Sequence, residues 1–471
     1  MGKKLFSLLA AVSAGLLVYL LSPGLPEEAA RLLGLLTATV LAWLLEVAPL
    51  GVVALAAAAA TVPLGLADKK EAFANFAHPI IFLFIGSFLL AEAFSKYRLD
   101  RYLALKVLKR PAVRRHELLF VAVVLFVPWF LSMWLSNTAT TAMLLPIVAG
   151  MLAALYPDGS WVSGRAKFLL LGIAYASSIG GIATPVGTPP NLIALGFLEK
   201  EGISVSFGEW ILKALPVSVL TLLFLLFLVK RLVGRLPTER LELPREEPGL
   251  NFTQKVVLFV FLSVVFLWLL PSLTGVLKNA WPPLEELHAF LKTHLHYSVV
   301  AVLGAALLFV LPDPARKRPV LEVSDLKRID WDTILLFGGG LTLGSLMFKT
   351  GLVHHFGQKL GSILPSSEWA VLFVLALVAV FLTEVSSNTA TTNVLVPVVL
   401  GLAHQLGLDP LKAVAATTLA CSYAFMLPMA TPPNAIVFGF ANFKISEMAK
   451  VGFVLNLFGA FVIATLVWLI W

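Results

Sequence analysis

Residues 136–141 read SNTATT, and residues 387–392 read SNTATT again. Each copy lies inside a long apolar stretch, residues 117–155 and residues 369–400. Because hydrocarbon satisfies no backbone polar group, non-helical backbone is tolerated at membrane depth only where protein buries it or a water-filled cavity contacts it. The repeated hexapeptide therefore predicts two polar sites inside an otherwise apolar molecule.

The composition is that of a membrane protein. The 471 residues are 59% hydrophobic and 13% charged, with a mean hydropathy of +0.91. These values predict an all-α polytopic membrane protein. The net charge of +8 is attributed to the Lys and Arg of cytoplasmic loops rather than to nucleic-acid binding. The single cysteine, Cys421, excludes an intramolecular disulfide.

A window of about 20 residues predicts the division of the chain into spans and interrupted segments. It gives about 11 transmembrane helices plus two re-entrant helical hairpins, since about 39 residues are too few for two full spans and a turn. The predicted parts are an N-terminal transmembrane helix in 1–29, a first repeat in 30–229, a cytoplasmic linker in 230–254 and a second repeat in 255–471. The interrupted segments are the hairpins 117–155 and 369–400 and the broken helices 166–197 and 412–440.

Basic residues predict the orientation. They concentrate in residues 96–115, 230–255 and 312–331, which fall on the same side as Lys3 and Lys4 if each hairpin returns to the side it entered. By the positive-inside rule that side is the cytoplasm. We therefore expect an integral protein of a bacterial or archaeal plasma membrane, with the N-terminus cytoplasmic and the C-terminus outside. The basic amphipathic stretch 96–115 is expected to lie along the inner membrane surface.

Three matches in the same order indicate an internal duplication. Besides SNTATT, TPVGTPPN at 184–191 matches LPMATPPN at 427–434, and FIGSFLL at 84–90 lies opposite FGGGLTL at 337–343. An odd number of predicted crossings separates the copies, so the repeats are inverted. Inverted repeats with helices broken at corresponding positions are typical of secondary transporters. Ordinary polar turns are the alternative, which two copies of both motifs disfavour.

The motif residues suit an anion bound together with cations. Ser, Asn and Thr favour helix N-termini, whose free N–H groups and dipole attract anions. Proline in TPPN interrupts a helix and leaves upstream carbonyls without partners. Ser132, Thr383, the Asn side chains and carbonyls near Gly187 and Ala430 are hard oxygen ligands, which suit Na⁺. No basic side chain occupies either motif to take the place of a cation.

On these residues the chain resembles the divalent anion sodium symporter family, which includes INDY-type dicarboxylate and citrate carriers. The resemblance covers nearly the whole chain and implies a homodimer with a scaffold domain and an elevator-type transport domain. It implies substrate contacts from Ser136, Asn137, Thr138, Ser387, Asn388, Thr389, Thr431 and Pro432. It implies Na⁺ sites at Asn137 and Gly187, with Ser132 nearby, and at Thr383, Ser386, Asn388 and Ala430.

Several alternatives remain open at this stage. The substrate could be succinate, malate, fumarate, citrate or sulfate, and the carrier could be a Na⁺-independent exchanger, although exchangers of the family tend to have a basic residue at the cation positions. A channel and an arsenite-exporter-type pump subunit are less favoured, and no Ser/His/Asp or Cys/His pattern predicts an enzyme. Glu384, an acid within the second hairpin, either carries a cation or proton or faces a polar crevice.

Overall fold

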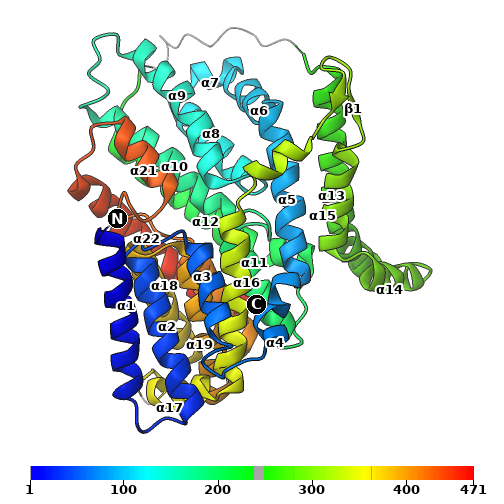
Figure 1. Ribbon diagram of the computed structural model, residues 1–471. Coiled ribbons are helices and arrows are strands. Elements are labelled where there is room, and N and C mark those ends of the chain that lie inside the picture. Colours follow the sequence, from blue (N-terminus) through cyan, green and yellow to red (C-terminus); the bar gives the residue numbers. More distant parts are fainter. Residues whose placement is uncertain (1, 238–248, 279–280, 362) are drawn as a thin grey trace.

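The computed structural model describes residues 2–237, 249–278, 281–361 and 363–471, and nearly all of its regular structure is helical (Figure 1). This confirms the predicted all-α polytopic class. Within the described residues, eight helices are long and apolar enough to cross a membrane. A ninth is counted if α14 (Leu284–His294) and α15 (Tyr297–Leu308), which meet at 74°, form one span.

The count by length is lower than the predicted eleven because the interruptions divide several segments. Each predicted segment contains a helix, but α3 (Leu50–Ala60) has only 11 residues. At 1.5 Å per residue it extends about 16 Å, roughly half the thickness of the hydrocarbon core. The halves of the two broken helices are similarly short, with 9 to 14 residues each.

The order of elements in the first part of the chain is repeated in the second. The first series is α1 (Gly2–Leu20), α2 (Glu27–Leu44), α3, α4 (Lys69–Ala74), η1 (Asn75–Ala77), α5 (Pro79–Lys96), α6 (Leu99–Leu108), α7 (Pro111–Arg115), α8 (Glu117–Ser132), α9 (Asn137–Leu155), η2 (Arg165–Lys167), α10 (Phe168–Gly181), α11 (Pro189–Lys200) and α12 (Phe207–Val233). The second is α13 (Phe252–Leu277), α14, α15, β1 (Pro312–Asp313), β2 (Arg318–Pro319), η4 (Val323–Arg328), α16 (Trp331–Lys349), α17 (Leu352–Gly361), α18 (Glu368–Val385), α19 (Asn388–Leu406), α20 (Pro410–Cys421), α21 (Pro432–Phe440) and α22 (Ile445–Ile470).

Corresponding elements of the two series lie at opposite ends of the molecule. The short helices α6 and α17 each follow a long helix and precede a hairpin, and Figure 1 shows them at opposite ends. The strands β1 and β2 form a small antiparallel pair in which Pro312 faces Pro319. The predicted linker 230–254 includes residues 238–248, which lie outside the described residues.

Helices of the two series pack on each other reciprocally. Helix α3 packs on α16, and α15 packs on α5. At the first contact, a Cβ added to Gly339 would lie 2.6 Å from the Ala54 carbonyl oxygen; at the second, a Cβ on Gly86 would lie 2.6 Å from the Ala301 carbonyl carbon. Gly86 and Gly339 are the third residues of FIGSFLL and FGGGLTL. The duplicated motif therefore provides the same close helix approach twice, as small residues do between membrane helices.

The substitution Gly339→Ala is expected to destabilise the protein. The added methyl group overlaps the backbone of α3, and overpacking of this kind costs about 1–3 kcal/mol. Thermal unfolding of the detergent-purified protein should show a lowered Tm. Gly150→Ala is the control, because an added Cβ there meets nothing within 4 Å. Equal Tm values for the two variants would contradict this packing.

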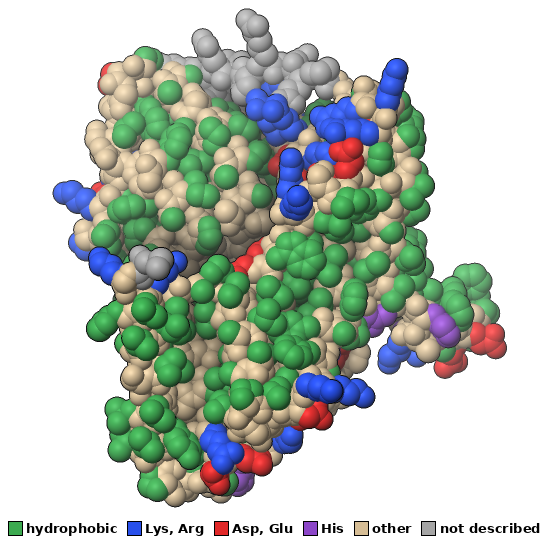
Figure 2. All heavy atoms as spheres, viewed as in Figure 1, with side chains coloured by type: hydrophobic (Ala, Val, Ile, Leu, Met, Phe, Trp, Pro, Cys, Tyr) green, Lys and Arg blue, Asp and Glu red, His purple; other side chains and the backbone are tan. Residues whose placement is uncertain are grey.

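The exterior is apolar over much of its area. Figure 2 shows hydrophobic side chains across most of the visible face, with Lys and Arg gathered toward the end that carries β1. Large apolar side chains such as Leu17, Phe259 and Phe266 are more than half exposed. A soluble monomer does not expose apolar surface on this scale, so the exterior is that of an integral membrane protein.

Candidate functional site

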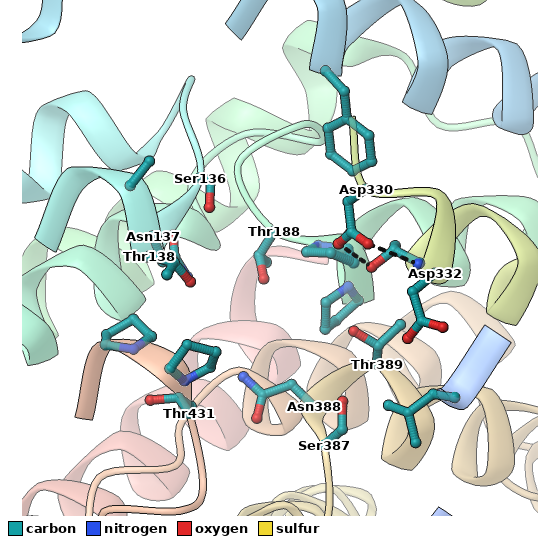
Figure 3. Close-up of a pocket in the computed structure, with 18 of the residues that line it drawn as sticks. Ser136, Asn137, Thr138, Thr188, Asp330, Asp332, Ser387, Asn388, Thr389 and Thr431 are labelled. Carbon is teal, nitrogen blue, oxygen red and sulfur yellow. Dashed lines mark hydrogen bonds between the residues drawn. The ribbon is translucent and has the colours of Figure 1, made fainter. Parts of the chain in front are cut away.

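A polar cavity of about 1100 Å³ lies where the two hairpins meet the two broken helices (Figure 3). Both Ser-Asn-Thr motifs and both Thr-Pro-Pro segments line it. Of the thirteen residues predicted for the site, eleven line this cavity: Ser136, Asn137, Thr138, Gly187, Ser386, Ser387, Asn388, Thr389, Ala430, Thr431 and Pro432. Residues up to about 300 positions apart in the sequence are thus brought together around one space.

Four helices begin at residues that line this cavity. The N-cap residues of α9, α11, α19 and α21 are Ser136, Thr188, Ser387 and Thr431. The first three have no side-chain capping hydrogen bond, whereas the Thr431 hydroxyl accepts one from the Asn434 amide. Uncapped first-turn N–H groups and four positive dipole ends make the cavity favourable for an anion.

The other two predicted residues, Ser132 and Thr383, lie buried behind the hairpin tips. Ser132 donates a hydrogen bond to Asn137 Oδ1. The Thr383 hydroxyl lies 2.7 Å from Asn388 Oδ1 and 2.8 Å from the Cys421 carbonyl oxygen. Each hairpin therefore places one hydroxyl beside the amide oxygen of its own tip, so the pairing is the same in both halves.

Backbone oxygens converge near the first tip. A Cβ added to Gly187 would lie 2.5 Å from the Gly181 carbonyl oxygen and 2.9 Å from that of Met133. A Cβ added to Gly181 would lie 2.7 Å from Asn137 Oδ1. Only glycine at 181 and 187 allows these oxygens to approach so closely, whereas alanine is accommodated at 430.

These oxygens fit a hard monovalent cation. Within the described residues no group of three or more His, Cys, Asp or Glu side chains is placed to hold a metal, so the available donors are hydroxyl, amide and carbonyl oxygens. Unwound backbone carbonyls in broken membrane helices coordinate Na⁺ in secondary transporters.

The asparagines of the two TPPN motifs correct one expectation. The carbonyls upstream of each proline pair were predicted to lack partners, but Asn191 Nδ2 lies 2.7 Å from the Thr184 oxygen and 3.1 Å from the Gly181 oxygen. In the second copy, Asn434 Nδ2 lies 3.1 Å from the Leu427 oxygen and 2.8 Å from the Ala424 oxygen. The amide donors thus satisfy several of these carbonyls, and the breaks are fixed by side chains rather than open.

An acidic wall of the cavity was not predicted. Glu46, Glu92, Asp330 and Asp332 line it together with only two basic residues, Lys4 and Arg328. These residues come from elements distant in sequence, and Figure 3 shows Asp330 and Asp332 near the start of α16. The sequence does contain one signal, because Asp330 precedes an apolar helix with Thr333 three residues later, a capping pattern.

Several of these acidic side chains are already hydrogen-bonded. Asp332 Oδ1 accepts from the Gly51 amide at 2.8 Å, and Glu92 lies 3.0 Å from Arg328. The wall therefore has a fixed geometry and an excess of negative charge.

Glu384 lies outside the cavity and is almost fully buried, with 3% of its surface exposed. Its carboxylate accepts hydrogen bonds from the Met426 amide at 2.7 Å, the Leu427 amide at 3.0 Å and Asn456 Nδ2 at 2.7 Å. All three donors belong to, or pack against, the break between α20 and α21. Met133 occupies the equivalent position in the first hairpin, so this carboxylate clamp exists in the second half only.

A helical membrane protein in which paired hairpins and broken helices enclose one polar cavity has the architecture of a secondary transporter. The chain belongs to the family described as "Sodium:sulfate symporter transmembrane region", whose sequence pattern matches residues 2–471. This membership confirms the resemblance to divalent anion sodium symporters. The protein is accordingly a transporter and not an enzyme.

Named relatives are similar over almost their whole length. An "Uncharacterized transporter" of Haemophilus influenzae is 34% identical over 441 residues, 93% of this chain and 91% of the relative. The "Sodium-dependent dicarboxylate transporter SdcS" of Staphylococcus saprophyticus is 31% identical over 446 residues, 90% and 83% of the two chains. The crystal structure of the Alcanivorax borkumensis YdaH transporter matches with a TM-score of 0.55 at 15% identity, covering 87% of each chain, which is a similarity of fold.

Proposed function

We propose that this protein is a secondary active transporter that carries small dicarboxylates of the succinate, malate and fumarate class inward together with Na⁺. The observation that carries the proposal is the meeting of both Ser-Asn-Thr tips at one cavity that four helix N-termini also reach. Two donor sets on opposing hairpins suit a substrate with a carboxylate at each end. The printed name of the SdcS relative supports the same class.

The charge of the cavity supports cation coupling. Four acidic residues and two basic residues line it, and neither Ser-Asn-Thr motif contains a basic side chain. A divalent anion entering this space meets net negative charge unless cations enter with it. The matched pairs of Ser132 with Asn137 and Thr383 with Asn388 are the proposed sites for those cations.

In the proposed mechanism, Na⁺ binds at both tips first and orders the loops, and the anion then binds between them. The predicted domains are part of the same proposal: two inverted repeats, 30–229 and 255–471, after the helix in 1–29. The hairpins and broken helices would form an elevator-type transport domain that moves against a scaffold. We also propose a homodimer in a bacterial or archaeal plasma membrane, with the N-terminus cytoplasmic.

Uptake of radiolabelled succinate into proteoliposomes tests the proposal. With an inward Na⁺ gradient we expect uptake at least tenfold above a K⁺ control, with no requirement for internal succinate. Uptake driven by internal succinate regardless of Na⁺ would establish an exchanger instead.

Sulfate is the second candidate, because the family description names it. Unlabelled sulfate, citrate and malate are therefore added as competitors in the same assay. Inhibition by sulfate but not by malate would replace the dicarboxylate in the proposal.

A further inference from the structure

A second cavity, of about 750 Å³, lies between the short basic helix α6 and the hairpin helix α9. One end of it is polar, with Arg98 and Arg101 contributed by α6 and its N-cap. The remainder is largely apolar and includes Leu105, Pro146 and Ile147. A groove that is cationic at one end and apolar along its length matches an amphiphile with an anionic head.

The wall formed by α9 leaves room for a chain. Pro146 and Gly150 are exposed, and a Cβ added to Gly150 would meet nothing within 4 Å. Exposed small residues also continue along α9 to Ala142, which lines the cavity of the candidate functional site. Ser95 lines both cavities, so the groove and the functional site share a wall.

The cationic end is directed to the membrane side where anionic lipid headgroups are expected. Both Arg98 and Arg101 are exposed, and they lie in the basic stretch 96–115 that the positive-inside rule assigns to the cytoplasm. Asp100 also lines the groove, with Oδ1 accepting from the Arg101 amide at 2.7 Å. Burial raises the pKa of Asp100, against the opposing influence of the two arginines, which weakens its competition for an anionic ligand.

We propose that this groove binds an anionic phospholipid, with its phosphate at Arg98 and Arg101 and one acyl chain along Pro146 and Gly150 of α9. Guanidinium groups pair with phosphate through two parallel hydrogen bonds, and basic pockets between membrane helices on the cytoplasmic side bind acidic lipid headgroups. Because the groove shares Ser95 with the functional site, bound lipid contacts the helix that moves with the first hairpin and alters the transport rate.

Native mass spectrometry of the detergent-purified full chain tests the proposal with dioleoyl phosphatidylglycerol and dioleoyl phosphatidylcholine as probes. We expect the wild type to bind the anionic lipid at least tenfold more tightly. The double variant Arg98→Gln/Arg101→Gln should lose this preference. Gly150→Phe should weaken binding with both arginines present, because the added ring fills the groove. Lys106→Gln/Arg110→Gln removes the same charge from the same segment outside the groove and should bind as wild type does.

Each other outcome overturns the proposal. Equal binding of the two lipids by the wild type would remove the headgroup site. Equal losses in both double variants would show diffuse surface attraction instead of a groove. Binding of inorganic phosphate at the concentrations that saturate with phosphatidylglycerol would identify a free-anion site. Because the readout is binding, the result is independent of whether the transported substrate is the proposed one.

Discussion

Replacing Asn137 or Asn388 with alanine should weaken Na⁺ activation and dicarboxylate uptake together, by about ten- to hundredfold, since removing one partner of a buried polar contact costs about 1–3 kcal/mol. Each side-chain oxygen is held by a hydroxyl behind it, Ser132 in one half and Thr383 in the other. Each asparagine is also the first residue of a half-helix that begins at the cavity. Its loss therefore removes a cation ligand and exposes the hydroxyl that oriented it.

The Na⁺ concentration dependence of succinate uptake is the measurement. Gln405→Ala is the matched control, because it removes an exposed amide from α19, the helix that Asn388 begins. Wild-type Na⁺ activation in both asparagine variants would rule out the proposed cation sites. A loss confined to one variant would leave one site and change the expected stoichiometry.

Replacing Glu384 with alanine should prevent stable folding. The change leaves three buried donors without an acceptor, the amides of Met426 and Leu427 and the side chain of Asn456. At about 1–3 kcal/mol each, the total of about 3–9 kcal/mol approaches the whole stability of a typical protein. Glu384→Gln retains one acceptor oxygen, so it should fold with a lowered Tm and a weakened response to Na⁺.

Glu368→Gln is the control for the carboxylate. It changes an acid at the start of the same helix, where Glu368 lies 3.3 Å from Lys412 and is partly exposed. Thermal unfolding and Na⁺-dependent uptake are measured for all three variants. A Glu384→Ala protein with wild-type Tm would show that the carboxylate does not hold the break between α20 and α21.

The positions of the helix interruptions could be predicted because their signals are local. Six polar residues in an apolar stretch, and a proline pair after a threonine, have few compatible conformations in a membrane. The structure begins α9 at Asn137 and α19 at Asn388, within the repeated hexapeptides, and α11 and α21 begin at the prolines of the TPPN motifs. Duplication made each signal visible twice.

The remaining features of the site depend on contacts between distant segments. Asn191 was part of a recognised motif, but its bonds to carbonyls up to ten residues upstream require the folded break. Asp330 and Asp332 reach the cavity only because α16 begins beside it. The role of Glu384 was left open between a cation site and a polar crevice, because hydropathy does not state which backbone amides a buried acid meets.

The reciprocal packing of the two halves has a consequence for synthesis. Helix α5 ends at Lys96, and its partner α15 begins at Tyr297, about 200 residues later; α3 waits about 270 residues for α16. At about 5–20 residues per second, each helix spends tens of seconds in the bilayer before its partner emerges. During that interval the notches at Gly86 and Ala54 face lipid or the insertion machinery. Nascent chains of this protein are therefore exposed to membrane chaperones and proteases for most of translation, and slowed elongation in the second half should reduce the yield of folded protein.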